Sequence, residues 1–499
     1  MDDSTAQDSL ELEVNDFGPI VDAKIDLRPL TVFVGPSNTG KSYLAILIYA
    51  LHRFFNNISW GRARRFDDES TADMPPETSA VLKKWAEQVH KTRRDIPIEK
   101  SVVVPSIVVK VIRSALGLQG DRLGREIVRS FGAIALEMLV RKEKRESAKF
   151  VLKRRSTVDS AISDHRLTIG AQGVDFRTNV TESIPMMIDA RSKPIYYLRR
   201  LLEEYKDRER PSWYSMDILE GMIHVVLSPS ITPLNRPVYY LPADRTGVMH
   251  AHSVVVSAMI GSAPMTGLRP PSGTPMLSGV LADFLQQLIE LDQPPHRQSL
   301  SKDDLGTKIE DTILGGSVQV ERSETIAYPH FTYTPEGWKN PLPLMNASSM
   351  VSELAPVVLY LRYMVSPGCT LIIEEPESHL HPAMQVEFTR QIAALVKAGV
   401  RIIVTTHSEW VLEELANIVR RSELPETRRE KIPHGEFALR PEQVGAWLFK
   451  PKRRPKGSVV EEIRFDPDAG GLETDFSEVA RQLYNDWATI GNRIAGNTE

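Results

Sequence analysis

The residues from Gly35 to Ser42 read GPSNTGKS and follow the pattern GxxxxGK[ST], which can hold a phosphate group. The two glycines let the backbone turn tightly and bring its N–H groups around phosphate oxygens. Lys41 can place its ammonium group against the β- and γ-phosphates, and Ser42 can offer a hydroxyl ligand to Mg²⁺. We therefore expect a bound nucleotide to be held by residues of this loop: Gly35, Asn38, Thr39, Gly40, Lys41 and Ser42.

Two adjacent carboxylates stand at the end of a second apolar segment. Residues 369–382 read CTLIIEEPESHLHP, and the run before Glu374 is typical of a buried parallel strand. Ligands of open α/β sheets sit off the carboxyl ends of the strands, where the phosphate loop would also lie. One of the two carboxylates, Glu374 or Glu375, can hold Mg²⁺ through water while the other polarises an attacking water. An acidic pair in a surface turn is the weaker alternative.

A histidine follows the next strand-like segment, RIIVTTHSEW, at position 407. A histidine after a strand usually satisfies local hydrogen bonds. If this strand lies beside the phosphate-binding strand, however, His407 would be near the γ-phosphate of a nucleotide bound at Lys41. We therefore interpret His407 as a catalytic residue that acts with the glutamate pair.

A pair of serines precedes a helical pattern in NASSMVSELAPVVLYL. Ser348 and Ser349 would place hydroxyls and backbone N–H groups at the N-terminus of a helix, which is an anion site. An ordinary serine cap is the alternative, and it explains at most one of the two serines.

The elements that must position these groups alternate between strand and helix patterns. Strand-like segments before the phosphate loop are broken at Gly18-Pro19 and at Pro29. Residues 123–145 have apolar residues near a helical period, and strand patterns follow at 148–156 and 165–180. The last 160 residues or so alternate apolar strands with amphipathic helices, which predicts a parallel α/β sheet.

The chain divides into four parts on these patterns. We assign residues 1–56 to an N-terminal lobe with the phosphate loop, and 57–235 to a lobe extension with a mainly helical insertion. Residues 236–465 form a C-terminal lobe with the serine, glutamate and histidine motifs, and 466–499 a C-terminal helical tail. We find no internal repeat.

The composition is that of a soluble protein of about three domains. Hydrophobic residues at 41% and charged residues at 25% are enough for a sizeable core. The net charge of −4 gives no overall attraction to nucleic acid or to an acidic membrane. The N-terminus lacks a signal-peptide layout and no apolar run approaches a membrane span, so we expect a cytoplasmic protein. Cys369, the single cysteine, is expected to be a small core residue.

The four motifs in this order resemble the ATPase head of the SMC, RecF and Rad50 type. They are most similar to the branch of OLD-type ATPases found in bacterial anti-phage systems. The resemblance covers roughly residues 10–56 and 236–465, and it is loose over 57–235. It implies an α/β P-loop fold with mixed sheets.

This resemblance also implies a role for each motif. Lys41 and Ser42 would bind the phosphates of ATP and Mg²⁺, Glu374 would complete the metal site, and Glu375 would activate water. His407 resembles the histidine that contacts the γ-phosphate. Ser348 and Ser349 would hold the γ-phosphate bound by Lys41 of a second copy, so the family implies a homodimer or higher homo-oligomer with ATP between the heads.

The chain departs from the family pattern at two positions. Met350 stands where the family usually has Gly, and Glu374 stands where Asp is commoner. A further segment, VYYLPADRTG, resembles the same branch and contains Arg245. Arg245 could face the nucleotide or a partner, or it could pair with Asp244, and we leave both interpretations open.

Two features of related proteins are missing from the pattern. The residues after His407 are too few for the nuclease domain of OLD-type proteins, and Asp466 and Asp468 with Glu461 and Glu462 form at most a degenerate metal site. Residues 57–235 are too short for a long coiled-coil arm. We therefore expect an ATP-dependent dimerisation switch that controls a separately encoded effector, in defence against phage.

The main alternative is a RecF-like ATPase that binds DNA in repair or recombination. Basic clusters at 141–155 and 450–456 could contact DNA, although a solvated charged face is the commoner explanation. A transporter ATPase subunit is disfavoured, because its signature would resemble LSGGQ.

Overall fold

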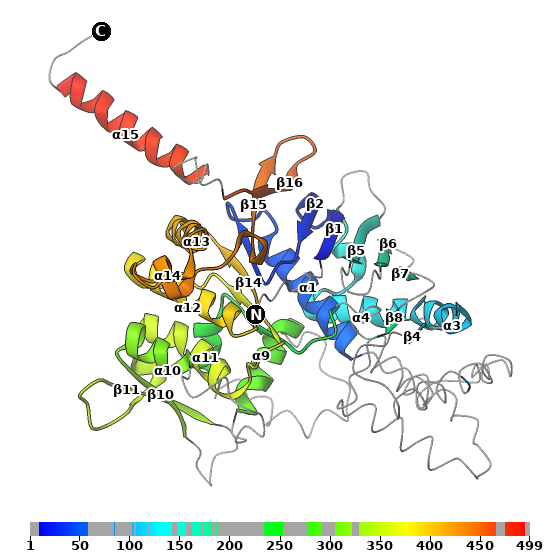
Figure 1. Cartoon of the computed structure of the whole chain (residues 1–499), viewed down its shortest axis with the longest axis horizontal. Helices are drawn as coiled ribbons and strands as arrows, with labels where there is room; N and C mark the ends of the chain where they lie inside the picture. Colours follow the sequence, from blue (N-terminus) through cyan, green and yellow to red (C-terminus); the bar gives the residue numbers. More distant parts are fainter. Residues whose placement is uncertain are drawn as a thin grey trace.

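The computed structural model describes most of both lobes and part of the segment between them (Figure 1). The described residues are 9–57, 84, 102–103, 106–117, 119–141, 147–155, 162–170, 173–180, 185–186, 234–252, 277–291, 305–321, 329–465 and 475–494.

One mixed sheet of eleven strands dominates the described part of the chain. Its strands lie in the spatial order β7 (Gly173–Val180), β6 (Ile162–Gly170), β5 (Ser147–Arg155), β1 (Ser9–Phe17), β2 (Ile20–Asp26), β16 (Gly457–Ile463), β15 (Val444–Lys452), β3 (Leu30–Val34), β14 (Arg401–Thr406), β13 (Thr370–Glu374) and β9 (Val238–Leu241). The predicted breaks at Gly18-Pro19 and Pro29 fall between strands, as expected.

The strands that carry the candidate motifs form the parallel half of this sheet. β14 lies between β3 and β13, and β15 and β9 continue the parallel arrangement on either side. Thr405 of β14 is in register with Phe33 of β3 and with Glu374 of β13. The carboxyl ends of these strands therefore meet at one edge, which confirms the parallel α/β arrangement predicted for the C-terminal part.

Helices cover both faces of the sheet, because alternate strand residues point to opposite sides. Ile372 and Ile403 pack into a hydrophobic cluster with α1 (Lys41–Asn56) and α4 (Gly120–Phe131). Leu371 and Ile373 pack into a second cluster with helices on the other face. The remaining described helices are α3 (Ser106–Gly117), α9 (Gly279–Ile289), α10 (Leu305–Ile309), α11 (Ser349–Tyr363), α12 (Pro382–Lys397), α13 (Glu409–Arg421), α14 (Glu426–Arg429) and α15 (Asp475–Ile494).

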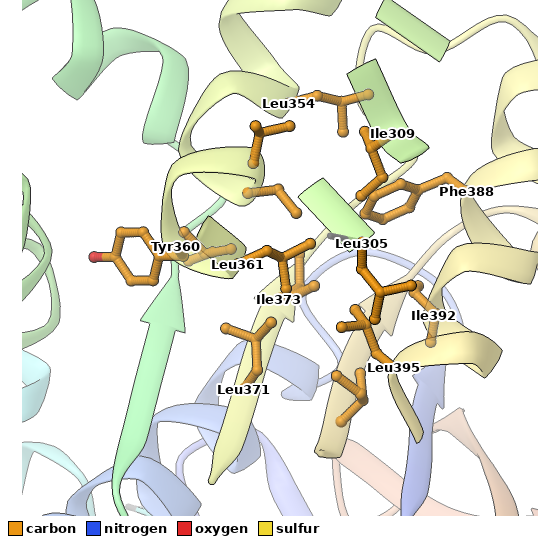
Figure 2. Packing of buried hydrophobic residues seen from close by; sticks show 14 of the residues in the cluster. Leu305, Ile309, Leu354, Tyr360, Leu361, Leu371, Ile373, Phe388, Ile392 and Leu395 are labelled. Carbon is orange, nitrogen blue, oxygen red and sulfur yellow. The ribbon is translucent and has the colours of Figure 1, made fainter. Parts of the chain in front are cut away.

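The second cluster holds the candidate motifs against one another (Figure 2). Leu371 and Ile373 of β13 lie beneath Leu361 of α11, and Phe388 of α12 closes the other side. Leu371 and Ile373 are fully buried and Phe388 is 2% exposed. Because α11 carries the serine pair at its N-terminus and β13 ends in the two glutamates, this packing fixes the two motifs in one rigid unit.

The helix predicted over residues 123–145 is shorter than expected. α4 ends at Phe131, and Gly132 follows with a left-handed φ of 63°. Ile134, one of the apolar residues in the predicted range, is 90% exposed, whereas Leu139 is buried after a single 3₁₀ turn over Leu136–Met138. The helical spacing of apolar residues was therefore misleading beyond Gly132, because glycine supplies the left-handed end of the helix.

Smaller elements complete the described part. β10 (Gly316–Glu321), β11 (His330–Pro335) and β12 (Leu342–Pro343) form a three-stranded sheet, and β4 (Val102–Val103) pairs with β8 (Pro185–Met186). The described part of 57–235 thus contributes strands as well as helices. α15 extends away from the body (Figure 1). No helix in the described ranges has the length and apolar content that crossing a membrane requires.

Candidate nucleotide-binding site

The phosphate loop leaves β3 at Val34 and enters α1 at Lys41. Gly35, Asn38 and Gly40 have left-handed φ values of 136°, 63° and 101°. A Cβ atom on Gly40 would lie 2.7 Å from Cγ1 of Ile20, and one on Gly35 would lie 2.6 Å from the carbonyl oxygen of Phe449. The loop can therefore keep this shape only with glycine at both positions. The fold thus places the predicted loop at the N-terminus of a long helix, where backbone N–H groups favour an anion.

Lys41 is buried beneath this loop, at 5% exposure. Its ammonium group donates hydrogen bonds to the carbonyl oxygens of Gly35 (2.8 Å) and Pro36 (2.9 Å). Burial lowers the pKa of Lys41 to about 8, against the opposing attraction of Glu375, Glu377 and Glu374. The lysine is therefore a cation held close to three carboxylates.

The other loop residues divide into internal and accessible groups. The Thr39 hydroxyl donates to the carbonyl oxygen of Pro36 (2.8 Å), and the Thr39 carbonyl accepts a hydrogen bond from the Ser458 hydroxyl, so Thr39 is tied into the protein. Asn38 and Ser42 are exposed. Of the predicted contacts, these two thus present their side chains to solvent, and their contact with nucleotide stays a prediction.

Glu374 ends β13 with its carboxylate turned inward, at 7% exposure. Its Oε2 accepts a hydrogen bond from the backbone N–H of Ala243 (3.2 Å), whereas Oε1 is buried and has no hydrogen-bond partner within ordinary limits. Burial raises the pKa of Glu374, and the neighbouring hydroxyls of Ser42 and Tyr240 act in the opposite direction. The structure therefore brings Ser42 beside Glu374, as the predicted metal site requires.

Glu375 and His407 meet at the same edge of the sheet. Glu375 has a left-handed φ of 42°, and its N–H donates to the carbonyl oxygen of Thr405 (2.9 Å). Its Oε1 lies 3.4 Å from Nε2 of His407, and both side chains remain about one-third exposed (37% and 32%). Burial and the charge of Lys41 lower the pKa of His407, so the imidazole is neutral at pH 7. A neutral imidazole can share a proton with the carboxylate or with a ligand.

A third carboxylate, Glu377, belongs to this group although the sequence analysis did not single it out. Its Oε1 accepts a hydrogen bond from the backbone N–H of His407 (2.5 Å), and its Oε2 is buried with no hydrogen-bond partner. Burial raises its pKa. Glu377 thus holds the turn that carries His407. The only available indication was a third acidic residue in the segment EEPE.

Ser348 and Ser349 begin α11 and are both exposed. The Ser348 hydroxyl accepts a hydrogen bond from the N–H of Val351 (3.4 Å), so it is the cap residue. Met350 is half-buried and packs against the second hydrophobic cluster. In the described part of the chain, no hydrogen bond or ion pair joins either serine to the phosphate loop. A meeting of the serines with a nucleotide across two copies stays a prediction.

Arg245 adopts neither of the two arrangements that the sequence left open. Its side chain is fully buried and forms an ion pair with Glu353 of α11. Its guanidinium also donates to the carbonyl oxygens of Glu374 (2.6 Å) and Glu375 (3.2 Å). Asp244 next to it is exposed. Arg245 therefore faces inward, where the five N–H donors of its guanidinium are shared among the carboxylate and several carbonyl groups.

The donor set at Ser42 and Glu374 fits Mg²⁺. Mg²⁺ is commonly held by one or two carboxylates together with substrate phosphates and water, and does not need a cage made of protein ligands. Among the described residues, no group of three or more His, Cys, Asp or Glu side chains is arranged as such a cage. Glu461 and Glu462 are paired with Lys450 (2.7 Å) and Arg28 (2.6 Å), and Asp466 and Asp468 lie outside the described residues.

Part of the chain matches a protein-family model. Residues 169–413 match a family described as "AAA domain, putative AbiEii toxin, Type IV TA system". This range contains the serine, glutamate and histidine motifs and begins after the phosphate loop. The fold is an α/β P-loop fold with one large mixed sheet. The predicted fold class is thereby confirmed. A comparison with curated protein sequences finds no match.

Several solved structures are similar to this head at low identity. The SMC head domain from Thermotoga maritima is 12% identical over 91% of this chain and 99% of that one, with a TM-score of 0.35. The Smc head with an extended coiled coil, bound to the C-terminal domain of ScpA from Pyrococcus furiosus, is 10% identical over 97% and 100%, with a TM-score of 0.40. The recombination mediator protein RecF is 9% identical over 92% and 100%, with a TM-score of 0.36. At these scores the comparison adds nothing about activity or partners.

Proposed function

We propose that this chain binds ATP with Mg²⁺ and hydrolyses it to ADP and phosphate. The observation that carries the proposal is the convergence of Lys41, Glu374, Glu375 and His407 at one edge of the parallel sheet. These groups come from three neighbouring strand ends that are far apart in the chain. A structural ion-pair network would pair Lys41 with a carboxylate directly, whereas its ammonium group is held by two loop carbonyls.

Each residue has a defined task in this reaction. The loop N–H groups and Lys41 bind the β- and γ-phosphates, and Ser42 and Glu374 hold Mg²⁺. When bound, Mg²⁺ stabilises the negative charge that develops on the transferred phosphoryl group. Glu375, which is partly exposed, orients the attacking water and accepts its proton. His407 lies 3.4 Å from that carboxylate and contacts the γ-phosphate.

The exposed serines support action by two copies. Ser348 and Ser349 open α11 with accessible hydroxyl and N–H groups, which is the geometry of an anion site. We propose that they bind the γ-phosphate held by Lys41 of a second copy. ATP then closes a homodimer, and hydrolysis opens it. The resemblance to OLD-type ATPases favours a cytoplasmic switch that controls a separate effector in defence against phage.

Replacement of the water-activating carboxylate tests this proposal. Glu375→Gln should keep ATP affinity within about threefold and lower kcat by about 100-fold or more, because the amide cannot accept the proton. Light scattering with ATP and Mg²⁺ should then show a stable dimer. Glu461→Gln, a partly exposed carboxylate paired with Lys450, is the matched control and should leave kcat unchanged. Hydrolysis by Glu375→Gln at the wild-type rate would show that another group activates the water.

A second candidate function is ATP-dependent binding of DNA. The tip of the hairpin formed by β15 and β16 supports it, since residues 451–456 are exposed and include Lys452, Arg453 and Arg454 with no acidic residue among them. A basic projection of this kind can contact phosphates without reading sequence.

A further inference from the structure

One buried ion pair connects the serine motif to the catalytic glutamates within a single chain. Arg245 and Glu353 are 0% and 1% exposed. Glu353 lies in the early part of α11, the helix that Ser348 caps. Arg245 follows β9 on a helical segment over residues 245–252 and reaches both α11 and the end of β13.

The guanidinium of Arg245 uses all of its nitrogens. Nε donates to the carbonyl oxygen of Glu353 (3.1 Å), and Nη2 pairs with the Glu353 carboxylate. Nη1 donates to the carbonyl oxygens of Pro242 (3.0 Å) and Glu374 (2.6 Å), and Nη2 also reaches that of Glu375 (3.2 Å). The Glu353 carboxylate accepts a further hydrogen bond from the Thr246 hydroxyl.

The end of β13 needs this support for a local reason. The parallel pairing of β13 with β9 stops at Ile373 and Leu241, and the residue that follows β9 is Pro242, which has no N–H to donate. The N–H of Ala243 is used by the carboxylate of Glu374. The Glu374 and Glu375 carbonyls therefore receive their hydrogen bonds from Arg245 on this side.

We infer that Arg245 is a positioning residue that couples the N-terminus of α11 to the backbone at Glu374 and Glu375. The inference rests on the proposed ATPase function. A phosphate that binds at Ser348 would pull on α11, and the buried pair would carry that shift to the two glutamates. Because both partners are buried and the guanidinium is held by several hydrogen bonds, the link is stiff, so a small movement is transmitted and not absorbed.

Substitution of Arg245 by lysine tests the positioning role. Lysine keeps the charge for Glu353, but one ammonium group cannot replace a planar guanidinium that holds a carboxylate and several carbonyls. Arg245→Lys should keep ATP affinity within about threefold and lower kcat by about tenfold or more, because the damage falls on the orientation of Glu375. A wild-type kcat in a folded Arg245→Lys protein would overturn the inference.

A second ion pair on the same helix serves as a control that distinguishes an effect on kcat from an effect on stability. Arg362, in the last turn of α11, pairs with Glu310 at 2.6 Å, and its side chain is 24% exposed. The paired replacements Arg245→Met/Glu353→Met and Arg362→Met/Glu310→Met each remove both charges, so neither leaves a buried charge unpaired. Only the first should lower kcat, even if both lower the melting temperature. Equal effects on kcat would make the Arg245 pair merely structural.

A double-mutant cycle tests the coupling itself. Ser348→Ala should lower kcat in the wild-type background and have at least about a threefold smaller effect in the Arg245→Lys background, since coupled residues are not additive. Equal fold-losses in both backgrounds would show that no coupling passes through Arg245. If the wild-type chain bound or hydrolysed no ATP, the proposed function itself would fail. Wild-type hydrolysis that Arg245→Lys leaves intact would overturn the coupling inference alone.

Discussion

Lys41 is a buried cation surrounded by the groups that would act on a nucleotide. Burial lowers its pKa to about 8, and the carboxylates of Glu375, Glu377 and Glu374 oppose that change. The two loop carbonyls that accept its hydrogen bonds are neutral, so its charge is only partly compensated. A phosphate group would compensate it further and raise the pKa of the lysine in the complex.

We therefore predict that nucleotide affinity falls as the pH rises through about 8. Above that pH the free protein loses the proton of Lys41 and must regain it on binding, so affinity should weaken by up to about tenfold per pH unit. Titration with a fluorescent ATP analogue from pH 6 to pH 10 measures this. Lys41→Arg is the control, since a guanidinium stays charged throughout and should give a flat profile.

The same ionisation acts on folding with the opposite sign. A lysine whose pKa is lowered from 10.5 to about 8 binds its proton less tightly in the folded state than in the unfolded state. Below pH 8 the buried charge of Lys41 lowers the free energy of unfolding by its full amount, and this effect disappears as the pH rises toward 10.5. The deprotonation of Lys41 therefore increases stability over the same pH range in which it weakens binding. Parallel losses of affinity and stability would contradict the assignment to Lys41.

At the scale of elements, short loops at the ends of parallel strands hold the site, and a hairpin projects from the same sheet. β15 lies beside β3, and Phe449 of β15 packs against Phe33 with ring centroids 5.6 Å apart. The root of the hairpin is therefore rigid, whereas its tip at 451–456 is exposed. The other basic cluster, at 141–155, differs because Lys153 on β5 forms an ion pair with Glu13 at 2.7 Å. The hairpin is thus the better candidate of the two basic clusters for contact with DNA.

We predict that a DNA-binding function would depend on this tip. Replacing Lys452, Arg453 and Arg454 by alanine should weaken duplex binding and reduce the slope of log affinity against log salt by about 0.9 for each phosphate that the variant no longer neutralises. Fluorescence anisotropy at several salt concentrations measures both quantities with ATP present. A control with three other exposed basic residues should change neither quantity: Arg420, Arg428 and Lys431. Equal losses in both triple variants would indicate a non-specific charge effect.

At the scale of the molecule, we propose that one chain carries both halves of a composite site. Lys41 and Glu375 lie at the carboxyl edge of the sheet, and the exposed Ser348 lies at the start of α11. Leu361 of α11 packs in one cluster with Ile373 of β13 and Phe388 of α12 (Figure 2). A head-to-head pair of copies would create two identical composite sites by symmetry.

We predict that two inactive variants restore hydrolysis when mixed. Lys41→Ala lacks the phosphate contact, and Ser348→Arg blocks the opposing surface. In a mixed dimer, one site combines the intact Lys41 of one chain with the intact Ser348 of the other. Equal mixing should recover about a quarter of wild-type activity, because about half of the dimers are mixed and each has one complete site. An ATPase assay on the mixture measures it, and no recovery would mean that each chain works alone.

The sequence by itself determined the phosphate loop, the strand ends and the parallel arrangement, because these follow from local patterns. The glycines of the loop, the apolar runs before Glu374 and His407 and the serine cap of α11 each depend on a few neighbouring residues. Only the tertiary structure decided the roles of Arg245 and Glu377. Arg245 meets Glu353, 108 positions away, and Glu377 meets His407, 30 positions away.

The end of α4 also shows where prediction from sequence failed. Apolar spacing predicted a helix to residue 145, but Gly132 ends it, because its left-handed φ cannot continue a helix. A charged residue such as Arg245 is read from sequence as a surface group, since burial costs free energy unless partners satisfy it. Those partners lie on other elements, so only the packed fold reveals that Arg245 belongs inside, between α11 and the end of β13.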